Sequence, residues 1–164
     1  MHSPSELLKH VEQAISEIQH PTYPGNLYEP ISYIMSLGGK RVRPTMLLMA
    51  VDLFSGDIFK ALPAAMAIET FHNFTLIHDD IMDNAPLRRG KQTVHEKWGT
   101  NTAILSGDVM MVEANKHITN VDVSILKPAL DTFNATAQGV CEGQQLDMEF
   151  ENRSDVSIPE YIDM

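Results

Sequence analysis

Residues 61–77 read ALPAAMAIETFHNFTLI, and this stretch decides the expected fold. A helix here is apolar almost all the way round, so we expect it to be buried on most of its sides. We expect it to run from about Phe59 to Asp83 and to end at residues 84–86, Asn-Ala-Pro, because proline cannot continue a helix. The sequence therefore predicts one long central helix with other elements packed around it.

The rest of the chain also reads as helices. Ser3, Pro4 and Glu6 form a helix-start signal, and apolar residues recur at helical spacing after them. Residues 88–100 read as a polar loop that contains a short helix around His95. Further helices are expected over residues 27–37, 44–53, 101–120 and 122–150. We therefore expect an all-α fold with helices in antiparallel succession.

Composition limits the classes of protein to which the chain can belong. Its 164 residues, 43% of them hydrophobic, leave room for one domain with a core. The net charge of −10 argues against nucleic-acid binding, which requires a basic face. Cys141 is the only cysteine, so no intrachain disulfide can form. There is no apolar signal-peptide core and no run of about 20 apolar residues. We expect a cytoplasmic protein without a transmembrane segment.

The long helix ends in a concentration of negative charge, because residues 76–90 read LIHDDIMDNAPLRRG. Asp79 and Asp83 differ by only about 40° around a helix, and Asp80 lies about 100° from Asp79. Like charges at this spacing repel, and the macrodipole disfavours anions at a helix C-terminus. A hard cation such as Mg²⁺ resolves the problem, since it binds carboxylate oxygens together with water and substrate phosphate.

Arg88 and Arg89 follow these aspartates after a short break. A guanidinium group matches phosphate oxygens in a bidentate manner, so paired arginines beside metal-binding carboxylates indicate a diphosphate site. The alternative is a solvated helix end with ordinary surface ion pairs, because short acidic motifs recur by chance. The apolar residues up to Ile77 favour the site, since they imply that this end of the helix faces an interior cavity.

Residues 38–44 read GGKRVRP and form a second cationic cluster. Its glycines allow close approach of the backbone to a ligand, and Lys40, Arg41 and Arg43 supply positive charge. A solvated basic turn is the alternative interpretation. His72 lies two helical turns before Asp79, within about 20° of the same face. It is either a satisfied core histidine or, together with Lys40 and Arg43, a third donor to phosphate.

At these residues the chain resembles the trans-isoprenyl diphosphate synthases, also called polyprenyl synthetases. The resemblance covers most of residues 38–149 and is carried, in the family's order, by GGKRVRP (38–44), ETFHNFTLIHDDIMDNAPLRRGKQTVHEKWG (69–99), ILSGDVMMVEA (104–114) and GQQLDME (143–149). It implies a bundle of long antiparallel helices around a deep cavity, usually in a homodimer. It also implies head-to-tail prenyl transfer, in which an allylic diphosphate ionises with the help of Mg²⁺ and isopentenyl diphosphate attacks the carbocation.

The resemblance also implies roles for individual residues. The implied ligands of isopentenyl diphosphate are Lys40, Arg43, His72 and Arg89. The implied ligands of the allylic diphosphate are Arg88, Gln144 and Asp147. Asp79 and Asp83 are the implied Mg²⁺ ligands, with Asp80 in support, and the groups expected to act in catalysis are Asp79, Asp80, Asp83 and Arg88. His78 and His95 are expected to be structural.

Product length is expected to depend on the residues four and five positions before the first aspartate, which are Thr75 and Phe74. On an ideal wheel Thr75 lies about 40° from Asp79, whereas Phe74 lies about 140° away. The role of Phe74 therefore comes from the resemblance alone. An aromatic residue there, with an uninterrupted DDxxD motif, resembles short-chain synthases of the geranylgeranyl type and next the farnesyl type, which make C15–C20 products.

Two elements of the family pattern, a second aspartate-rich motif and a Lys-Thr pair, do not occur in residues 1–164. Ser157 begins a helix pattern that extends only to Met164. We therefore expect residues 1–164 to be the N-terminal part of a single all-helical domain, with part of the metal site. We expect no prenyltransferase activity from this chain in isolation.

Two other functions remain open. One is a metal phosphohydrolase, with His78 and Asp79 as an HD motif, but this leaves GGKRVRP unexplained. The other is a non-catalytic subunit of a heteromeric prenyl synthase. Such subunits tend to lose the aspartates of the first motif, and this chain keeps all three.

Overall fold

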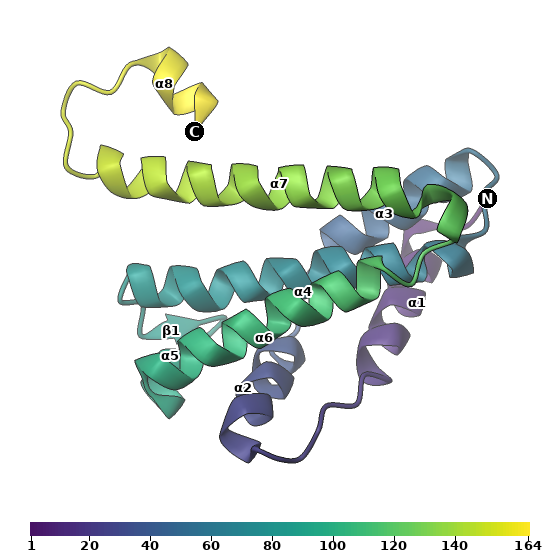
Figure 1. Cartoon of the computed structure of the whole chain (residues 1–164), viewed down its shortest axis with the longest axis horizontal. Helices are drawn as coiled ribbons and strands as arrows, with labels where there is room; N and C mark the ends of the chain where they lie inside the picture. Colours follow the sequence, from purple (N-terminus) through teal and green to yellow (C-terminus); the bar gives the residue numbers. More distant parts are fainter. The chain divides into compact units, whose positions relative to one another are not determined.

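The computed structural model describes residues 1–164 as eight helices and one short hairpin (Figure 1). The elements are α1 (Pro4–Ser16), α2 (Gly25–Ser36), α3 (Val42–Leu53), α4 (Ile58–Met82), β1 (Leu87–Arg88), β2 (Lys91–Gln92), α5 (Val94–Trp98), α6 (Thr100–Ile118), α7 (Val123–Phe150) and α8 (Ile158–Asp163). They divide into two compact units, residues 1–122 and residues 123–164. The predicted helical fold is confirmed, whereas the assignment of residues 1–164 to a single domain stays a prediction.

Helix α4 is the centre of the first unit, where it lies beside α6 along much of its length (Figure 1). Its N-terminal half packs against α1 and α3 around the buried side chains of Leu7, Val11, Leu48, Ile58 and Ala65. Its C-terminal half packs against α2, α5 and α6 around Ile31, Ile34, Met35, Ile77, Val94, Ala103 and Met110. Every residue from 65 to 71 except Ile68 is buried, so the expectation of a helix covered on most sides is confirmed.

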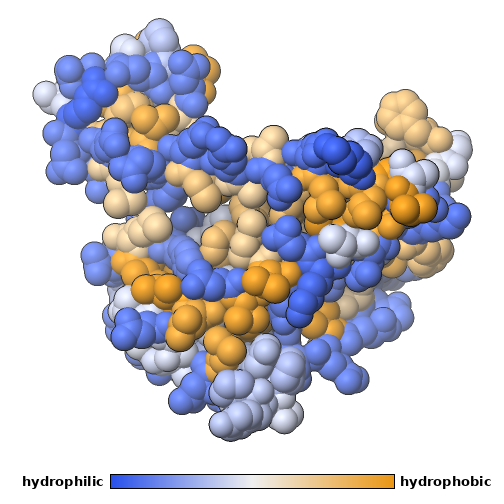
Figure 2. Space-filling model, in the orientation of Figure 1, coloured by the Kyte–Doolittle hydropathy of each residue, from blue (hydrophilic) through white to orange (hydrophobic).

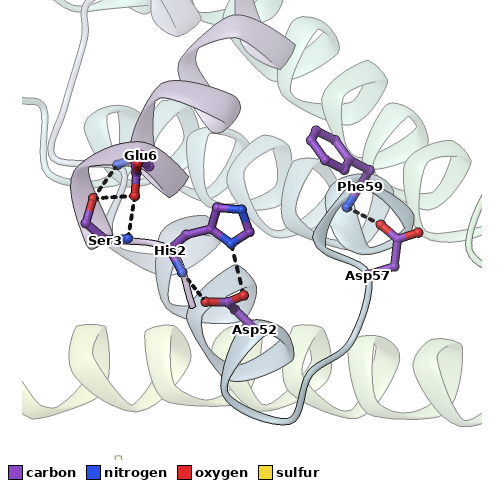
Figure 3. Close-up of polar contacts among 6 residues, drawn as sticks. All are labelled: His2, Ser3, Glu6, Asp52, Asp57 and Phe59. Carbon is purple, nitrogen blue, oxygen red and sulfur yellow. Dashed lines mark hydrogen bonds and ion pairs between the residues drawn. The ribbon is translucent and has the colours of Figure 1, made fainter.

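Polar side chains hold the helix ends at one corner of this unit (Figure 3). The hydroxyl of Ser3 accepts a hydrogen bond from the backbone N–H of Glu6, whose carboxylate accepts one from the N–H of Ser3 at 2.7 Å. This confirms the predicted start of α1. Asp52, in the last turn of α3, accepts a hydrogen bond from the N–H of His2 at 2.6 Å. Asp57 caps α4 by accepting from two backbone N–H groups of its first turn.

Helix starts differ from the expected positions by up to two residues. Helix α3 begins at Val42 rather than Pro44, because Arg41 adopts a left-handed conformation (φ 45°) and stands at the N-cap. Helix α2 begins at Gly25 rather than Leu27. Sequence periodicity does not locate such starts: a left-handed residue precedes α3, whereas an extended proline, Pro24, precedes α2.

The expected polar loop over residues 88–100 begins with a short hairpin that the sequence did not predict. Strands β1 and β2 pair in antiparallel register, with Leu87 opposite Gln92. The turn residues Arg89 and Gly90 have φ of 53° and 76°, the left-handed pair that is typical of a tight hairpin turn. The short helix expected around His95 is confirmed as α5. Two-residue strands are too short to show any alternation of polar and apolar residues.

The second unit consists of α7 and α8. Helix α7 spans nearly the predicted range of 122–150. Ser157 caps α8 as predicted: its hydroxyl accepts from the N–H of Glu160, whose carboxylate accepts from the N–H of Ser157 at 2.8 Å. Across both units, none of the helices combines the length and the apolar character that a membrane span requires.

Candidate functional site

The predicted acidic site lies at the C-terminal end of α4. The helix stops because Asn84 adopts a left-handed conformation (φ 49°) and the N–H of Ala85 donates to the carbonyl oxygen of Asp80 at 2.9 Å. This is a Schellman ending with asparagine in the position that usually holds glycine. Asp79 and Asp83 stand one turn apart in this last segment, and the N–H of Asp83 donates to the carbonyl oxygen of Asp79 at 2.8 Å.

Asp79 and Asp83 are crowded carboxylates without a cationic partner. Neither forms an ion pair or a side-chain hydrogen bond. Burial, and then the charge of Asp83, raise the pKa of Asp79 above its ordinary value. The charged form is therefore disfavoured, and a cation would relieve that cost.

The donor set fits Mg²⁺ better than a metal that the protein alone must enclose. No group of three or more histidine, cysteine, aspartate or glutamate residues is arranged to hold an ion. Mg²⁺ usually takes one or two protein carboxylates and completes its shell with water and substrate phosphate. Asp79 and Asp83 match that requirement.

Asp80 has a different environment from its neighbours. Its side chain is 1% exposed and binds the guanidinium group of Arg88. The Nε of Arg88 donates to both carboxylate oxygens at 2.9 and 2.8 Å, and Nη2 lies 2.7 Å from Oδ1. This hydrogen bonding is the first cause of the raised pKa of Arg88. Asp80 therefore holds Arg88 in place, and any part that it has in catalysis acts through that arginine.

The two predicted cationic clusters meet in the first unit. A methyl group placed on Gly39 would lie 3.0 Å from both terminal nitrogens of Arg89. Nη1 of Arg43 lies 3.4 Å from Nε2 of His72. Burial is the first cause of the lowered pKa of His72, and the positive charge of Arg43 is the second, with further contributions from Arg89 and Arg88. These side chains therefore share one electropositive region next to the acidic end of α4.

Other predicted ligands are not drawn into this cluster. Lys40 is exposed and makes no ion pair. Gln144 and Asp147 belong to the second unit, where their spacing of three residues places them on one face of α7. Their roles stay predictions.

The residues expected to set product length lie in the second half of α4. Phe74 packs against the core cluster around Ile77, and its ring meets the ring of His78 edge-on, with centroids 4.7 Å apart. Nε2 of His78 lies 3.3 Å from the carbonyl oxygen of Ile104 on α6, in agreement with a structural role. The hydroxyl of Thr75 donates to a backbone carbonyl one turn earlier. Control of product length by Phe74 and Thr75 stays a prediction.

Sequence reasoning missed a buried ion pair next to the cationic cluster. Nη1 of Arg41 lies 2.5 Å from Oε1 of Glu69, and the two side chains are 5% and 3% exposed. Nδ2 of Asn73 donates to the same oxygen at 3.0 Å. The available signal was Glu69 itself, a lone acid in the most apolar part of α4. A buried acid requires a partner, and Arg41 supplies it.

Comparisons with known proteins agree with the motifs. The model of the polyprenyl synthetase family matches residues 24–164. The chain is 44% identical over 158 residues to the geranylgeranyl diphosphate synthase of Methanosarcina mazei, a match that covers 94% of this chain and 48% of that protein. It is 36% identical to the farnesyl diphosphate synthase of Micrococcus luteus, over 91% of this chain and 53% of that protein.

Solved structures agree as well. A crystal structure of a geranylgeranyl pyrophosphate synthase matches 99% of this chain and 50% of its own, with a TM-score of 0.95 and 45% identity. The geranylgeranyl pyrophosphate synthetase of Pyrococcus horikoshii matches with a TM-score of 0.92 and 39% identity, over 98% of this chain and 50% of its own. The predicted isoprenoid synthase fold is thereby confirmed. The chain spans about half the length of the curated relatives it matches. Because the family model matches most of its residues, this chain belongs to the polyprenyl synthetase family.

Proposed function

We propose that the chain carries the first aspartate motif and the diphosphate-binding cations of a prenyltransferase. The proposed reaction condenses isopentenyl diphosphate with an allylic diphosphate and yields a C15–C20 prenyl diphosphate. One observation carries the proposal. Two carboxylates without a cationic partner, Asp79 and Asp83, stand beside Arg88, which in turn adjoins Arg89 and His72.

The proposed ligands of isopentenyl diphosphate are Arg43, His72 and Arg89, together with Lys40 from the adjoining loop. Arg43 and Arg89 bring permanent charge, and guanidinium groups match diphosphate oxygens in pairs. His72 is kept neutral by burial and by its cationic neighbours. It can donate one hydrogen bond as a neutral ring, and it gains a proton more easily when an anion is next to it.

The proposed ligands of the allylic diphosphate are Arg88, Gln144 and Asp147. Arg88 is fixed by Asp80 before any substrate arrives, so little rearrangement accompanies the departure of the diphosphate group. Asp79 and Asp83 are the proposed ligands of Mg²⁺, which supplies positive charge to the leaving diphosphate when it is bound.

Phe74 is the proposed limit to product length. It is aromatic, half-buried and packed against the core at the end of α4 that carries the acids. The relatives that support a C15–C20 product are named as farnesyl and geranylgeranyl diphosphate synthases. In an active protein, Phe74→Ala is expected to lengthen the products relative to the parent, and unchanged chain lengths would remove Phe74 from this role.

A homodimer through α6 is also proposed. Apolar side chains gather over this helix on the surface of the first unit (Figure 2). Ile104, Leu105 and Val112 are the exposed apolar residues there, on adjoining sides of the helix. Leu105→Glu is expected to shift the protein to monomers in sedimentation velocity, while Glu17→Gln, a polar change at an exposed position outside α6, leaves the dimer intact. A protein that is monomeric from the start contradicts this assignment.

Because the one cysteine of the chain, Cys141, is exposed and unpaired, we propose a reducing, cytoplasmic location.

The activity is tested by joining residues 1–164 to the second half of the Methanosarcina mazei relative. This chimera is incubated with Mg²⁺, labelled isopentenyl diphosphate and farnesyl diphosphate, and prenyl products are separated by length. We expect product from the chimera and none from residues 1–164 alone. Asp79→Ala with Asp83→Ala is expected to abolish the product, while Cys141→Ala, at an exposed position, keeps it. A folded chimera that makes no product, or retains activity without both aspartates, contradicts the proposal.

A further inference from the structure

Arg41 stands between two proposed phosphate ligands, Lys40 in the loop before α3 and Arg43 in the first turn of α3, but its environment is different. Lys40 and Arg43 are exposed, whereas Arg41 is 7% exposed. Its Nη1 donates to Glu69, and its Nη2 donates to the carbonyl oxygen of Met35 at 2.7 Å. Each of its two terminal nitrogens thus already donates a hydrogen bond within the protein, and the buried side chain is turned to these partners.

Glu69 places a negative charge close to a site proposed for an anion. The pKa of Arg89 is lowered, first by burial and then by the positive charge of Arg41. The negative charge of Glu69 acts in the opposite direction and raises the pKa of Arg89, so Glu69 interacts electrostatically with this arginine. An unpaired buried carboxylate would be costly and would also repel diphosphate. Arg41 compensates the charge, and Asn73 fixes the carboxylate by donating to Oε1 at 3.0 Å. The ion pair and Arg89 therefore form one electrostatic unit.

The backbone of the loop turns sharply next to this pair. Gly38, Gly39 and Arg41 have φ of 76°, 144° and 45°. A left-handed conformation costs a residue with a side chain about 1–2 kcal/mol, so the two bonds made by the Arg41 guanidinium help to hold the loop in this form. Gly39 in turn contacts Arg89, since even a methyl group at residue 39 would lie 3.0 Å from its Nη atoms. The loop thereby forms one wall beside the guanidinium group of Arg89.

We propose that Arg41 and Glu69 are positioning residues that hold the Gly38–Gly39 loop, and through it Arg89, in the geometry that binds diphosphate. Neither residue touches the ligand. This inference rests on the proposed function, in which Arg43 and Arg89 bind diphosphate directly. It adds that the buried pair of Arg41 and Glu69 contributes to the affinity of that site for diphosphate.

The variant Glu69→Gln separates position from charge. It removes a negative charge beside an anion site, so electrostatics alone would tighten diphosphate binding. Positioning requires the opposite result, because glutamine cannot form the ion pair that holds Arg41. Arg41→Lys is the second variant. It keeps the charge, but an ammonium group cannot reproduce the fork that reaches Glu69 and Met35 together.

Binding of inorganic diphosphate to residues 1–164 is measured by calorimetry. We expect Glu69→Gln and Arg41→Lys each to weaken binding about tenfold, equivalent to about 1.4 kcal/mol. Glu17→Gln, the same change at an exposed position, is expected to leave it unchanged. Far-UV circular dichroism identifies the variants that fold. The Nε–H resonance of Arg89 provides the positional readout and is expected to shift in both variants.

The outcomes separate this inference from the function on which it rests. If Arg43→Ala and Arg89→Ala do not weaken diphosphate binding, the proposed function fails at this site. If they weaken it while Glu69→Gln and Arg41→Lys do not, the positioning role alone is overturned. Weaker binding with an unmoved Arg89 resonance also overturns it, because the loss then has another cause. Should Glu69→Gln not fold, Arg41→Lys decides by the same two measurements.

Discussion

The carboxylates of α4 fall into two groups with different environments. Glu69 and Asp80 are buried, and each binds an arginine that comes from another segment of the first unit. Asp79 and Asp83 have no such partner, and the pKa of Asp79 is raised. The two groups lie on the same helix, and three of the four residues lie within five positions.

The difference distinguishes carboxylates that hold the arginines of the site in place from carboxylates that are available to bind a cation. Both buried carboxylates are held inside the protein: Arg88 contacts both oxygens of Asp80, and Arg41 and Asn73 donate to Oε1 of Glu69. An unpaired and crowded carboxylate is unfavourable until a cation arrives. The count of acids in DDIMD therefore overstates the metal ligands, because Asp80 belongs with Glu69 rather than with Asp79 and Asp83.

The largest effect that tests this comparison is on stability. Asp80→Ala leaves the half-buried guanidinium group of Arg88 without its partner, so we expect the free energy of unfolding to fall by about 2–3 kcal/mol. Asp83→Ala removes an exposed carboxylate without a partner, and we expect a change below about 0.5 kcal/mol. Urea denaturation of both variants measures the difference. Equal losses would erase the distinction between the two groups.

His72 extends the comparison to a basic group on the same helix. Burial and Arg43 lower its pKa, so its ring is neutral in the free protein near pH 7. A bound diphosphate favours the imidazolium form, and binding is then coupled to proton uptake. Between pH 7.5 and pH 6 we expect this coupling to tighten diphosphate binding by about threefold, roughly 0.7 kcal/mol.

The measurement is the pH slope of the diphosphate affinity of residues 1–164, compared with that of His72→Gln. Diphosphate itself gains protons in this range, and the variant subtracts that contribution. Identical slopes would show that His72 takes up no proton when the anion binds. A weaker affinity at low pH in the parent alone would reverse the sign and exclude an anion next to the ring.

Sequence patterns could predict the helices because local signals specify them. The apolar run of residues 61–77 predicts a buried α4, and Ser3 and Ser157 begin helices through short-range hydrogen bonds. The partners of buried charges are set by tertiary structure instead. A helical wheel gives the direction of Asp80, but nothing local shows that a hairpin turn returns Arg88 to meet it. For the same reason Arg41 could not be separated from the exposed cations next to it.

The smallest predicted effect concerns the unpaired group itself. The pKa of Asp79 in the folded protein lies above its ordinary value of 3.8, so the ionised form lowers stability at neutral pH. Without metal at pH 7 we expect Asp79→Asn to raise the free energy of unfolding by about 0.5 kcal/mol, the size of a like-charge pair at this spacing. The gain should shrink as the pH falls towards 4, because the parent then takes up the proton and loses the same repulsion.

Millimolar Mg²⁺ should stabilise the parent but not the Asp79→Asn variant. Asp108→Asn, an exposed change on α6, serves as the control in urea denaturation with EDTA or Mg²⁺. If Asp79→Asn lowers stability in EDTA, then Asp79 is a paired structural residue, and the division between the two groups of carboxylates does not hold.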